Sequence, residues 1–306
     1  MADLLGLHHV TAIASEPQAN LDFYCGVLGL RLVKRTVNFD DPGSYHLYYG
    51  DAAGRPGTLI TFFPWPGARR GRAGAGQTSA NAFIVPRGSL EVWRARLSKL
   101  GVTPGATESR FGDEVIAFDD PDGMSIELVA AGEESREPWI TGLHSVTLLM
   151  LDPQPSAALL TESMGFRAMG AEGHRYRFEV AEGGPGAIID VLHAPDAAPG
   201  VMAAGAIHHV AFRAADDAAQ LDWRRTLADA GASVSEVMDR DYFHSIYFRE
   251  PGGVLYEIAT DPPGFTVDEP LETLGEALRI PAWLEPTRAR IERTLPPITV
   301  PKRRDP

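Results

Sequence analysis

A pair of adjacent histidines followed by a strand-like apolar run occurs twice in this chain. "GLHHVTAIA" begins at Gly6, and "AIHHVAFRA" begins at Ala206. The residue pattern of both runs favours a β-strand over a helix. Neighbouring side chains on a strand point to opposite faces, so the two histidines of a pair cannot share one role. Such internal repetition strongly restricts the fold and calls for a search for further copies.

A second marker, a Gly/Pro-rich turn followed by an apolar run, recurs along the chain. The four copies are "GRPGTLITFF" from Gly54, "DPDGMSIELV" from Asp120, "GGPGAIIDVL" from Gly183 and "EPGGVLYEIA" from Glu250. Glycine and proline supply the backbone angles of such turns, and the runs that follow favour strands. Helix-like segments precede these turns, beginning at Pro17, Ser89, Pro155 and Asp216. The repeating unit is therefore a strand, a helix and further strands.

These markers predict an α+β fold of four βαβββ modules. The modules cover about residues 5–65, 77–131, 141–194 and 205–262. Each module needs a neighbour to cover its sheet, so we expect the modules to pair into two domains. We place the N-terminal domain at 1–135 and the C-terminal domain at 140–265, on either side of the polar stretch "GEESREPWITG". The Pro-rich tail, 266–306, is expected to pack on the surface.

Composition restricts the class of protein. The 306 residues are 44% hydrophobic and 23% charged, which is typical of a soluble globular chain. The net charge of −13 argues against nucleic-acid or anionic-membrane partners, because phosphate binding depends on clustered Lys and Arg. A single cysteine fits a reducing compartment, and no signal-peptide pattern or membrane-length apolar run is present. We expect a cytoplasmic protein, and a homo-oligomer is allowed.

Alignment of the modules singles out a few polar positions. The opening strands place His9 and His209 at one position, with Ser145 in the third module. The closing strands align Thr61, Glu127, Asp190 and Glu257. Only the first and fourth modules offer histidine at this position, and only the fourth adds a carboxylate. Glu127 and Asp190 lack a histidine partner, so we expect structural roles for them.

His9, His209 and Glu257 together make a metal-ligand set. Two imidazoles and one carboxylate are what non-haem iron(II) uses, with positions left open for substrate and O₂. The set contains no cysteine, which argues against a closed structural zinc site. Glu257 lies in an apolar run, and a cation offsets the cost of burying its charge. The alternative is that Glu257 pairs with an arginine or lies at the sheet edge. Thr61 stands where a fourth ligand would be expected and leaves the metal more open.

Several longer motifs carry a family resemblance through nearly the whole chain. They include "LHHVT", "RLVKRTVNFDD", "YHLYYGD", "GTLITFFP", "RFGDEVIAFDDPDG", "AIHHVAF" and "YFREPGGVLYEIA". With these motifs the chain resembles the vicinal oxygen chelate (glyoxalase/extradiol dioxygenase) superfamily, and more narrowly its hydroquinone-type ring-cleaving dioxygenases. The resemblance implies two domains of paired βαβββ modules around a metal, with the three residues above as the iron ligands.

The resemblance also implies roles for residues around the metal. His8 and His208 match pocket-lining positions, and Tyr247 and Arg240 match the substrate pocket. Tyr247 and Arg240 are an odd number of residues apart, so a loop or bulge must separate them if both face one pocket. His208 or Tyr247 is the expected proton donor. His46 also matches the family pattern, and we expect a packing or hydrogen-bonding role for it.

The activity implied is Fe(II)-dependent insertion of both atoms of O₂ into a hydroquinone-type, or alternatively catechol-type, aromatic diol. The ligand set does not distinguish Fe(II) from Mn(II). One rival is a metal-dependent glyoxalase-like isomerase or lyase, which would turn over without O₂. Another is a non-catalytic protein that binds an aromatic compound or antibiotic, and such a protein would not need the metal ligands.

Overall fold

The computed structural model describes residues 3–301, and the chain forms the four predicted βαβββ modules. The first contains β1 (Leu7–Ala14), α1 (Pro17–Leu21), the π-helix η1 (Asp22–Val27), β2 (Arg31–Val37), β3 (Tyr45–Gly50) and β4 (Leu59–Pro64). The second contains β5 (Gln77–Pro86), α2 (Leu90–Lys99), β6 (Glu108–Arg110), β7 (Asp113–Asp119) and β8 (Ser125–Gly132).

The second half of the chain repeats this order. The third module contains β9 (Gly142–Met150), α3 (Gln154–Ala158), the π-helix η2 (Leu159–Ser163), β10 (Arg167–Glu172), β11 (Arg175–Glu179) and β12 (Ile188–His193). The fourth contains β13 (Ile207–Ala214), α4 (Asp217–Asp229), β14 (Met238–Asp239), β15 (Phe243–Arg249) and β16 (Leu255–Pro263). Each helical segment follows the opening strand of its module, as the sequence predicted.

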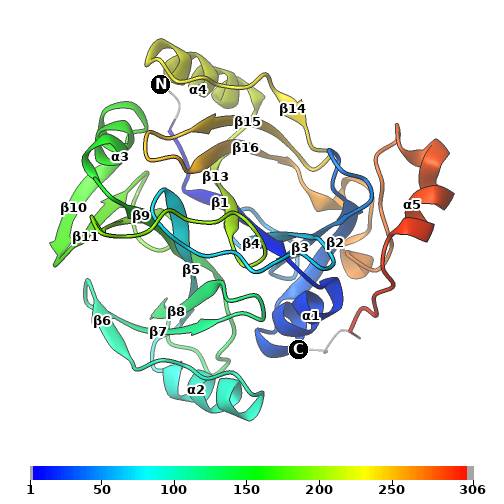
Figure 1. Ribbon diagram of the computed structural model, residues 1–306, viewed down its shortest axis with the longest axis horizontal. Helices are drawn as coiled ribbons and strands as arrows, with labels where there is room; N and C mark the ends of the chain where they lie inside the picture. Colours follow the sequence, from blue (N-terminus) through cyan, green and yellow to red (C-terminus); the bar gives the residue numbers. More distant parts are fainter. Residues whose placement is uncertain (1–2, 302–306) are drawn as a thin grey trace.

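The strands form two sheets of eight strands, each curled into a half-barrel (Figure 1). One sheet has the order β14-β15-β16-β13-β1-β4-β3-β2, and the other has the order β10-β11-β12-β9-β5-β8-β7-β6. The first sheet therefore joins the first and fourth modules, and the second sheet joins the second and third. Two glyoxalase-type domains result, as the sequence predicted.

Each sheet contains strands from both sides of the domain boundary that we expected near residues 135–140. Within a module, the opening strand pairs with its own closing strand along one edge only, as β1 does with β4. The free edge of β1 then pairs with β13, with Val10 opposite Val210, and β5 pairs with β9 in the same way. Unpaired strand edges expose backbone groups, and this pairing satisfies them. The predicted domain bounds follow the order of the chain and do not coincide with the two sheets. They stay a prediction: 1–135, 140–265 and, for the tail, 266–306.

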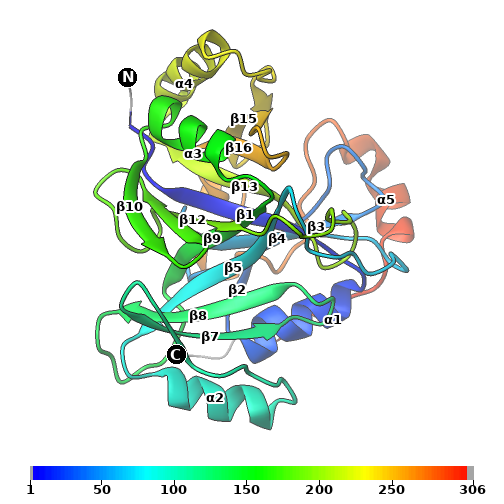
Figure 2. The ribbon, with the colours of Figure 1, turned by 60° about the vertical axis from the view of Figure 1, so that its left-hand side comes forward.

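The main hydrophobic cluster takes side chains from both sheets and from the helices packed on them, and Figure 2 shows α2 at the bottom and α4 at the top of the molecule, flanking the sheets. Val10 and Val210 of one sheet and Phe83 and Val146 of the other belong to the same buried cluster. Because side chains alternate along a strand, residues next to these valines point to the concave face. The concave face of the first sheet is thus where the side chain of His9 lies.

After β16 the chain runs along the outer edge of the first sheet (Figure 1). This segment contains η3 (Phe265–Val267), η4 (Leu271–Thr273), η5 (Glu285–Thr287) and α5 (Arg288–Thr294). It is attached to β2 by a bridge between Arg35 and Leu278 and by buried Lys34, which pairs with Asp268 and Glu269. None of the helices in residues 3–301 has the length and apolar character needed to cross a membrane.

Candidate metal centre

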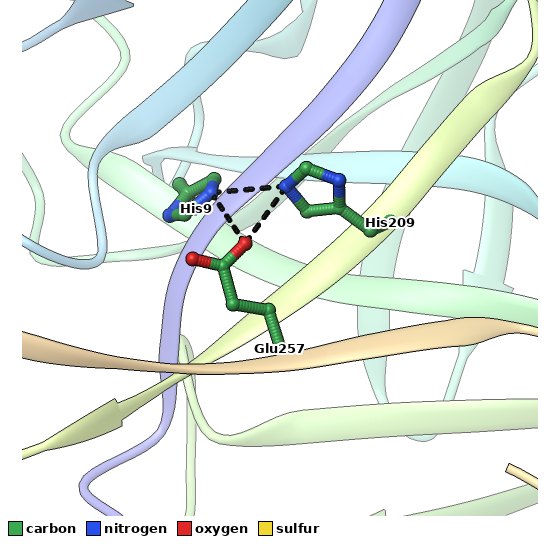
Figure 3. Close-up of side chains that lie close together, drawn as sticks. All are labelled: His9, His209 and Glu257. Atoms are coloured by element: carbon green, nitrogen blue, oxygen red, sulfur yellow. Dashed lines mark hydrogen bonds and ion pairs between the residues drawn. The ribbon is translucent and has the colours of Figure 1, made fainter. Parts of the chain in front are cut away.

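Three neighbouring strands bring His9, His209 and Glu257 together (Figure 3). Ala211 of β13 is the partner of His9 on β1 and of Glu257 on β16, and His209 lies two residues earlier on the same face of β13. The Nε2 atoms of the two histidines are 3.2 Å apart. Oε2 of Glu257 is 3.4 Å from Nε2 of His9 and 2.9 Å from Nε2 of His209. All three side chains are buried.

The arrangement of these atoms fits a shared cation. Oε2 of Glu257 is fully buried and makes no hydrogen bond of acceptable geometry, although two imidazole nitrogens lie close to it. Oε1 accepts a hydrogen bond from Ser245 at 2.5 Å, which orients the carboxylate. Metal–ligand distances of about 2.0–2.2 Å would place donor atoms roughly 3.0–3.5 Å apart at bond angles of roughly 90–110°. The observed separations agree with that spacing.

The protonation states also suit a cation. Burial would raise the pKa of Glu257, but the neighbouring His9 and His209 outweigh it and hold the pKa well below its usual value. Burial lowers the pKa of His209, although Glu257 acts in the opposite direction. A carboxylate and a neutral imidazole are the forms in which these residues bind metals.

The second histidine of each pair contacts the first. Nδ1 of His8 is 2.9 Å from Nδ1 of His9, and Nδ1 of His208 is 2.8 Å from Nδ1 of His209. Such contacts fix the ring orientation of a metal-binding histidine. His208 lines the cavity above the triad, whereas His8 is buried behind His9 against Phe243 and does not line it. The role that the resemblance implied for His8 stays a prediction, and the contact that the structure gives it is with His9, a candidate ligand.

A cavity of about 350 Å³ opens above the triad. Aromatic rings supply a large part of its wall, including those of His46, Tyr48, Phe63, Trp65, Phe243 and Tyr247. Flat, apolar walls with a few polar groups are typical of sites for small aromatic ligands. Figure 3 shows the three candidate ligands converging from separate strands.

Arg240 and Tyr247 both line this cavity and contact each other. Nε of Arg240 donates a hydrogen bond to the Tyr247 hydroxyl at 3.3 Å, and its guanidinium lies 5.4 Å from the ring centroid. The strand structure is interrupted between β14 and β15, where Asp241 has a φ of 63°. The predicted loop between Arg240 and Tyr247 is therefore confirmed. Burial raises the pKa of Tyr247, and the Glu257 carboxylate raises it further. Arg240 also forms an ion pair with Asp40 at the cavity mouth.

Sequence analysis did not find a hydrogen-bonded chain beside the triad. Oγ1 of Thr61 lies 2.8 Å from Oγ1 of Thr11 and 2.9 Å from Nε2 of His46. Nδ1 of His46 lies 2.9 Å from the Tyr48 hydroxyl. His46 therefore has the hydrogen-bonding role that we expected, and Thr61 is fully engaged. The alternation of His46 and Tyr48 in "YHLYYG" was the available signal, since it places both on one face of β3.

The second half-barrel holds arginines at the equivalent place. Ala82 of β5 is the partner of both Glu127 and Ser145, as Ala211 is of Glu257 and His9 in the first sheet. Arg110 donates to Glu127 at 2.5 Å, and Arg177 makes two hydrogen bonds to Asp190. These buried carboxylates are thus neutralised by guanidinium groups, which is the structural role expected for them.

The fold and the metal-ligand cluster agree with a match to a known family. The model of the Glyoxalase/Bleomycin resistance protein/Dioxygenase superfamily matches residues 6–128 and 142–258. The chain belongs to this superfamily.

Within the superfamily, ring-cleaving dioxygenases are similar over the full length. The "Putative ring-cleaving dioxygenase MhqO" of Bacillus subtilis (strain 168) is 49% identical, with 97% of each chain covered. The "Chlorohydroquinone/hydroquinone 1,2-dioxygenase" of Sphingobium indicum is 34% identical, with 95% of each chain covered. A crystal structure titled as a putative dioxygenase from Bacillus subtilis superposes with a TM-score of 0.93 at 47% identity, covering 98% of this chain and 99% of that one. Glyoxalase I from Zea mays shares only the fold, with a TM-score of 0.65 at 14% identity over 89% of this chain and 97% of that one.

Proposed function

We propose that this protein is a non-haem Fe(II)-dependent dioxygenase that cleaves the ring of a hydroquinone-type aromatic diol. The observation that carries the proposal is the convergence of His9, His209 and Glu257 at the base of an aromatic-walled cavity. The full-length similarity to proteins named as ring-cleaving dioxygenases supports the same reaction class. Mn(II) is the alternative metal, and a catechol-type diol is the alternative substrate.

Bound iron would supply the one-electron chemistry that lets O₂ react with the aromatic ring. The chain supplies His9 and His209 as neutral ligands and Glu257 as the one anionic ligand. A divalent ion in this set keeps one net positive charge, which favours a diol bound as its monophenolate. The charge of the ligand set thus favours one ionisation state of the substrate.

Other residues of the chain bind and orient the diol. Tyr247 is the strand partner of Glu257, its ring centroid lies 5.9 Å from that of His209, and Arg240 donates a hydrogen bond to its hydroxyl. The aromatic walls exclude water from the ring, which holds the reactants in place. His208 or Tyr247 provides the proton that the opening ring requires, and His8 orients His9.

The reaction consumes one O₂ per diol and needs no external reductant, since both oxygen atoms enter the product. The test is an oxygen-electrode measurement on protein loaded with Fe(II) without air, using hydroquinones and catechols as substrates. We expect O₂ uptake equal to the diol consumed, with loss of the aromatic absorbance. Substrate conversion without O₂ uptake would show an isomerase or lyase instead. Diol binding that survives in Glu257→Ala, in a protein that takes up no divalent metal, would show a binding protein.

A further inference from the structure

The hydrogen-bonded chain of Thr11, Thr61, His46 and Tyr48 has one end at the cavity. It crosses from β1 through β4 to β3 by the three contacts described above. Thr11, Thr61 and Tyr48 are all buried, and His46 and Tyr48 are among the residues that line the cavity. The hydrogen-bonded chain therefore runs from the interior of the sheet to the cavity above the triad.

The four side chains of this hydrogen-bonded chain carry more transferable hydrogens than there are hydrogen bonds between them. Two threonine hydroxyls, one tyrosine hydroxyl and one neutral imidazole each carry a single transferable hydrogen. Burial lowers the pKa of His46 well below its usual value and raises the pKa of Tyr48 well above its own, so neither group changes charge near neutral pH. Three contacts use three of the four hydrogens, and the fourth is left on Thr11, Thr61 or Tyr48. A hydrogen left on Thr61 would be buried without an acceptor, since within residues 3–301 Oγ1 of Thr61 contacts only Thr11 and His46.

The surroundings of the two ends decide which way the hydrogens point. If they pointed toward Thr11, its hydroxyl hydrogen would need an acceptor, and within residues 3–301 Oγ1 of Thr11 contacts only Thr61. A buried donor without an acceptor is costly. In the opposite direction Thr11 donates to Thr61, Thr61 donates to Nε2 of His46, and Nδ1–H of His46 donates to Tyr48. The hydroxyl hydrogen of Tyr48 is then the one left over, and Tyr48 lines the cavity, so a ligand bound there is the available acceptor.

We propose that Tyr48 donates this hydrogen bond to the ring hydroxyl of the aromatic diol that the metal does not hold. The inference rests on the proposed function. Tyr247 is the strand partner of Glu257, whereas Tyr48 lies on β3 at a different part of the cavity wall, so the two hydroxyls suit two separate oxygens of one diol. The Tyr48 ring packs 5.1 Å from Phe265 and 4.0 Å from His46 between ring centroids, so its hydroxyl is preorganised.

His46 acts in this arrangement as a positioning residue. Both of its ring nitrogens are engaged, Nε2 with Thr61 and Nδ1 with Tyr48. Its ring also packs between Tyr48 and Phe63, at 4.0 and 4.4 Å from their centroids. It has no free nitrogen for a metal or for proton transfer with substrate. Its function is to orient the Tyr48 hydroxyl.

The test is an anaerobic binding titration of the Fe(II)-loaded protein with hydroquinone, 4-methoxyphenol and phenol. Hydroquinone and 4-methoxyphenol carry a second oxygen that accepts a hydrogen bond, and phenol does not. We expect the first two to bind about 3- to 10-fold more tightly than phenol, as one hydrogen bond implies. In Tyr48→Phe this preference should disappear. Equal affinities in the unsubstituted protein, or an unchanged preference in Tyr48→Phe, would overturn the inference.

Tyr49→Phe is the matched control, because it makes the same chemical change at the next residue of β3. The Tyr49 hydroxyl is also buried, but it donates to Asn20 and does not line the cavity. Tyr49→Phe should keep the full preference for a second ring oxygen. Its loss in both variants would mean that the preference reflects general packing of β3, and this result would also overturn the inference.

Thr61→Val tests whether the chain acts as a unit. This change preserves the shape of the side chain but removes the contact to His46, so His46 is free to accept the Tyr48 hydrogen. We expect Thr61→Val to weaken the preference, and Tyr48→Phe combined with Thr61→Val to lose no more than Tyr48→Phe alone. If the losses of binding preference in the two single variants simply add in the double variant, the inference that the four residues act as a unit is wrong. The titration uses no O₂, so a failed oxygen-uptake assay and a failed binding preference are separate results.

Discussion

The Nε2 atoms of His9 and His209 lie 3.2 Å apart, although 200 positions separate the two residues in the sequence. They meet because β1 and β13 are antiparallel neighbours, with Thr11 opposite His209. The first and last modules thus each contribute to one site, and Glu257 completes it from the strand beyond β13. A metal bound there connects three strands of one sheet, so its removal should affect both the stability of the protein and its activity.

Glu257→Gln should abolish tight metal binding while leaving the shape of the site nearly unchanged. Loss of the only anionic ligand should weaken binding by more than about 100-fold, since changes behind a ligand alone cost up to that factor. Metal at 100 times its Kd should stabilise the native protein by about 2.7 kcal/mol, and the variant should lose this gain. Metal analysis after gel filtration, and melting curves with and without Fe(II), measure both effects.

Glu127→Gln is the control for this prediction. Glu127 holds the position in the second sheet that Glu257 holds in the first, but it pairs with Arg110. The control should therefore keep its metal content and its melting shift on adding Fe(II), even if its baseline stability falls. Normal metal content in Glu257→Gln would contradict the assignment of the triad.

Tyr247→Phe and His208→Gln separate the two candidate proton donors. Both residues line the cavity, and loss of a general acid typically lowers the rate by about 10²- to 10⁴-fold. We expect the variant that lacks the donor to lose kcat by this factor with little change in KM. The other variant should mainly raise KM, because it loses a binding contact. Steady-state oxygen uptake at saturating O₂ measures the two constants, and unchanged kinetics in both variants would exclude both residues.

The repeat explains how much of this architecture the sequence predicts. The markers around "HHV" and the Gly/Pro turns define four modules, and the structure has them with helices at the expected places. The recurrence of His9 at His209 and the carboxylate of Glu257 also suffice to single out the three candidate metal ligands that the structure brings together. These features depend on local patterns and on a shared position within each module, both of which a sequence displays directly.

Other features depend on contacts that no local pattern displays. Which modules share a sheet is decided by the pairing of the free edges of β1 and β5, which the order of the modules along the chain does not display. His8 contacts His9 and Phe243 and does not line the cavity, and β1 has a register irregularity between Leu7 and His9. The contact of Thr61 with His46 depends on how β3 and β4 are paired. Such cross-strand relations appear only once the register is known.

The stability of the metal-free protein should fall in mild acid because of His144. Burial lowers its pKa to about 4, and it lies in the second sheet, away from the triad. Below the unfolded-state pKa of about 6.5, the unfolded chain binds a proton that the folded protein does not. Stability is therefore lost as the pH falls from about 6.5 to about 4, by up to about 3 kcal/mol from this group. Urea unfolding at pH 7 and pH 5 should show a smaller decrease in His144→Gln, and an equal decrease would contradict the prediction.

Lys34→Met should destabilise the protein through the segment that follows β16. The Lys34 ammonium is fully buried on β2 and pairs with Asp268 and Glu269, while Tyr242 donates a hydrogen bond to Asp268. Removing one partner of a buried ion pair typically costs about 3–5 kcal/mol, because the remaining charge stays buried without compensation.

Arg55→Met provides the comparison for this effect. Arg55 pairs with Asp51 on the surface, with 73% of its side chain exposed, so its loss should cost less than about 1 kcal/mol. Urea unfolding of both variants measures the difference. Because Tyr242 packs against Phe265, and Phe265 packs against Tyr48, Lys34→Met should also weaken hydroquinone binding. Equal stability of the two variants would show that the segment after β16 does not depend on Lys34.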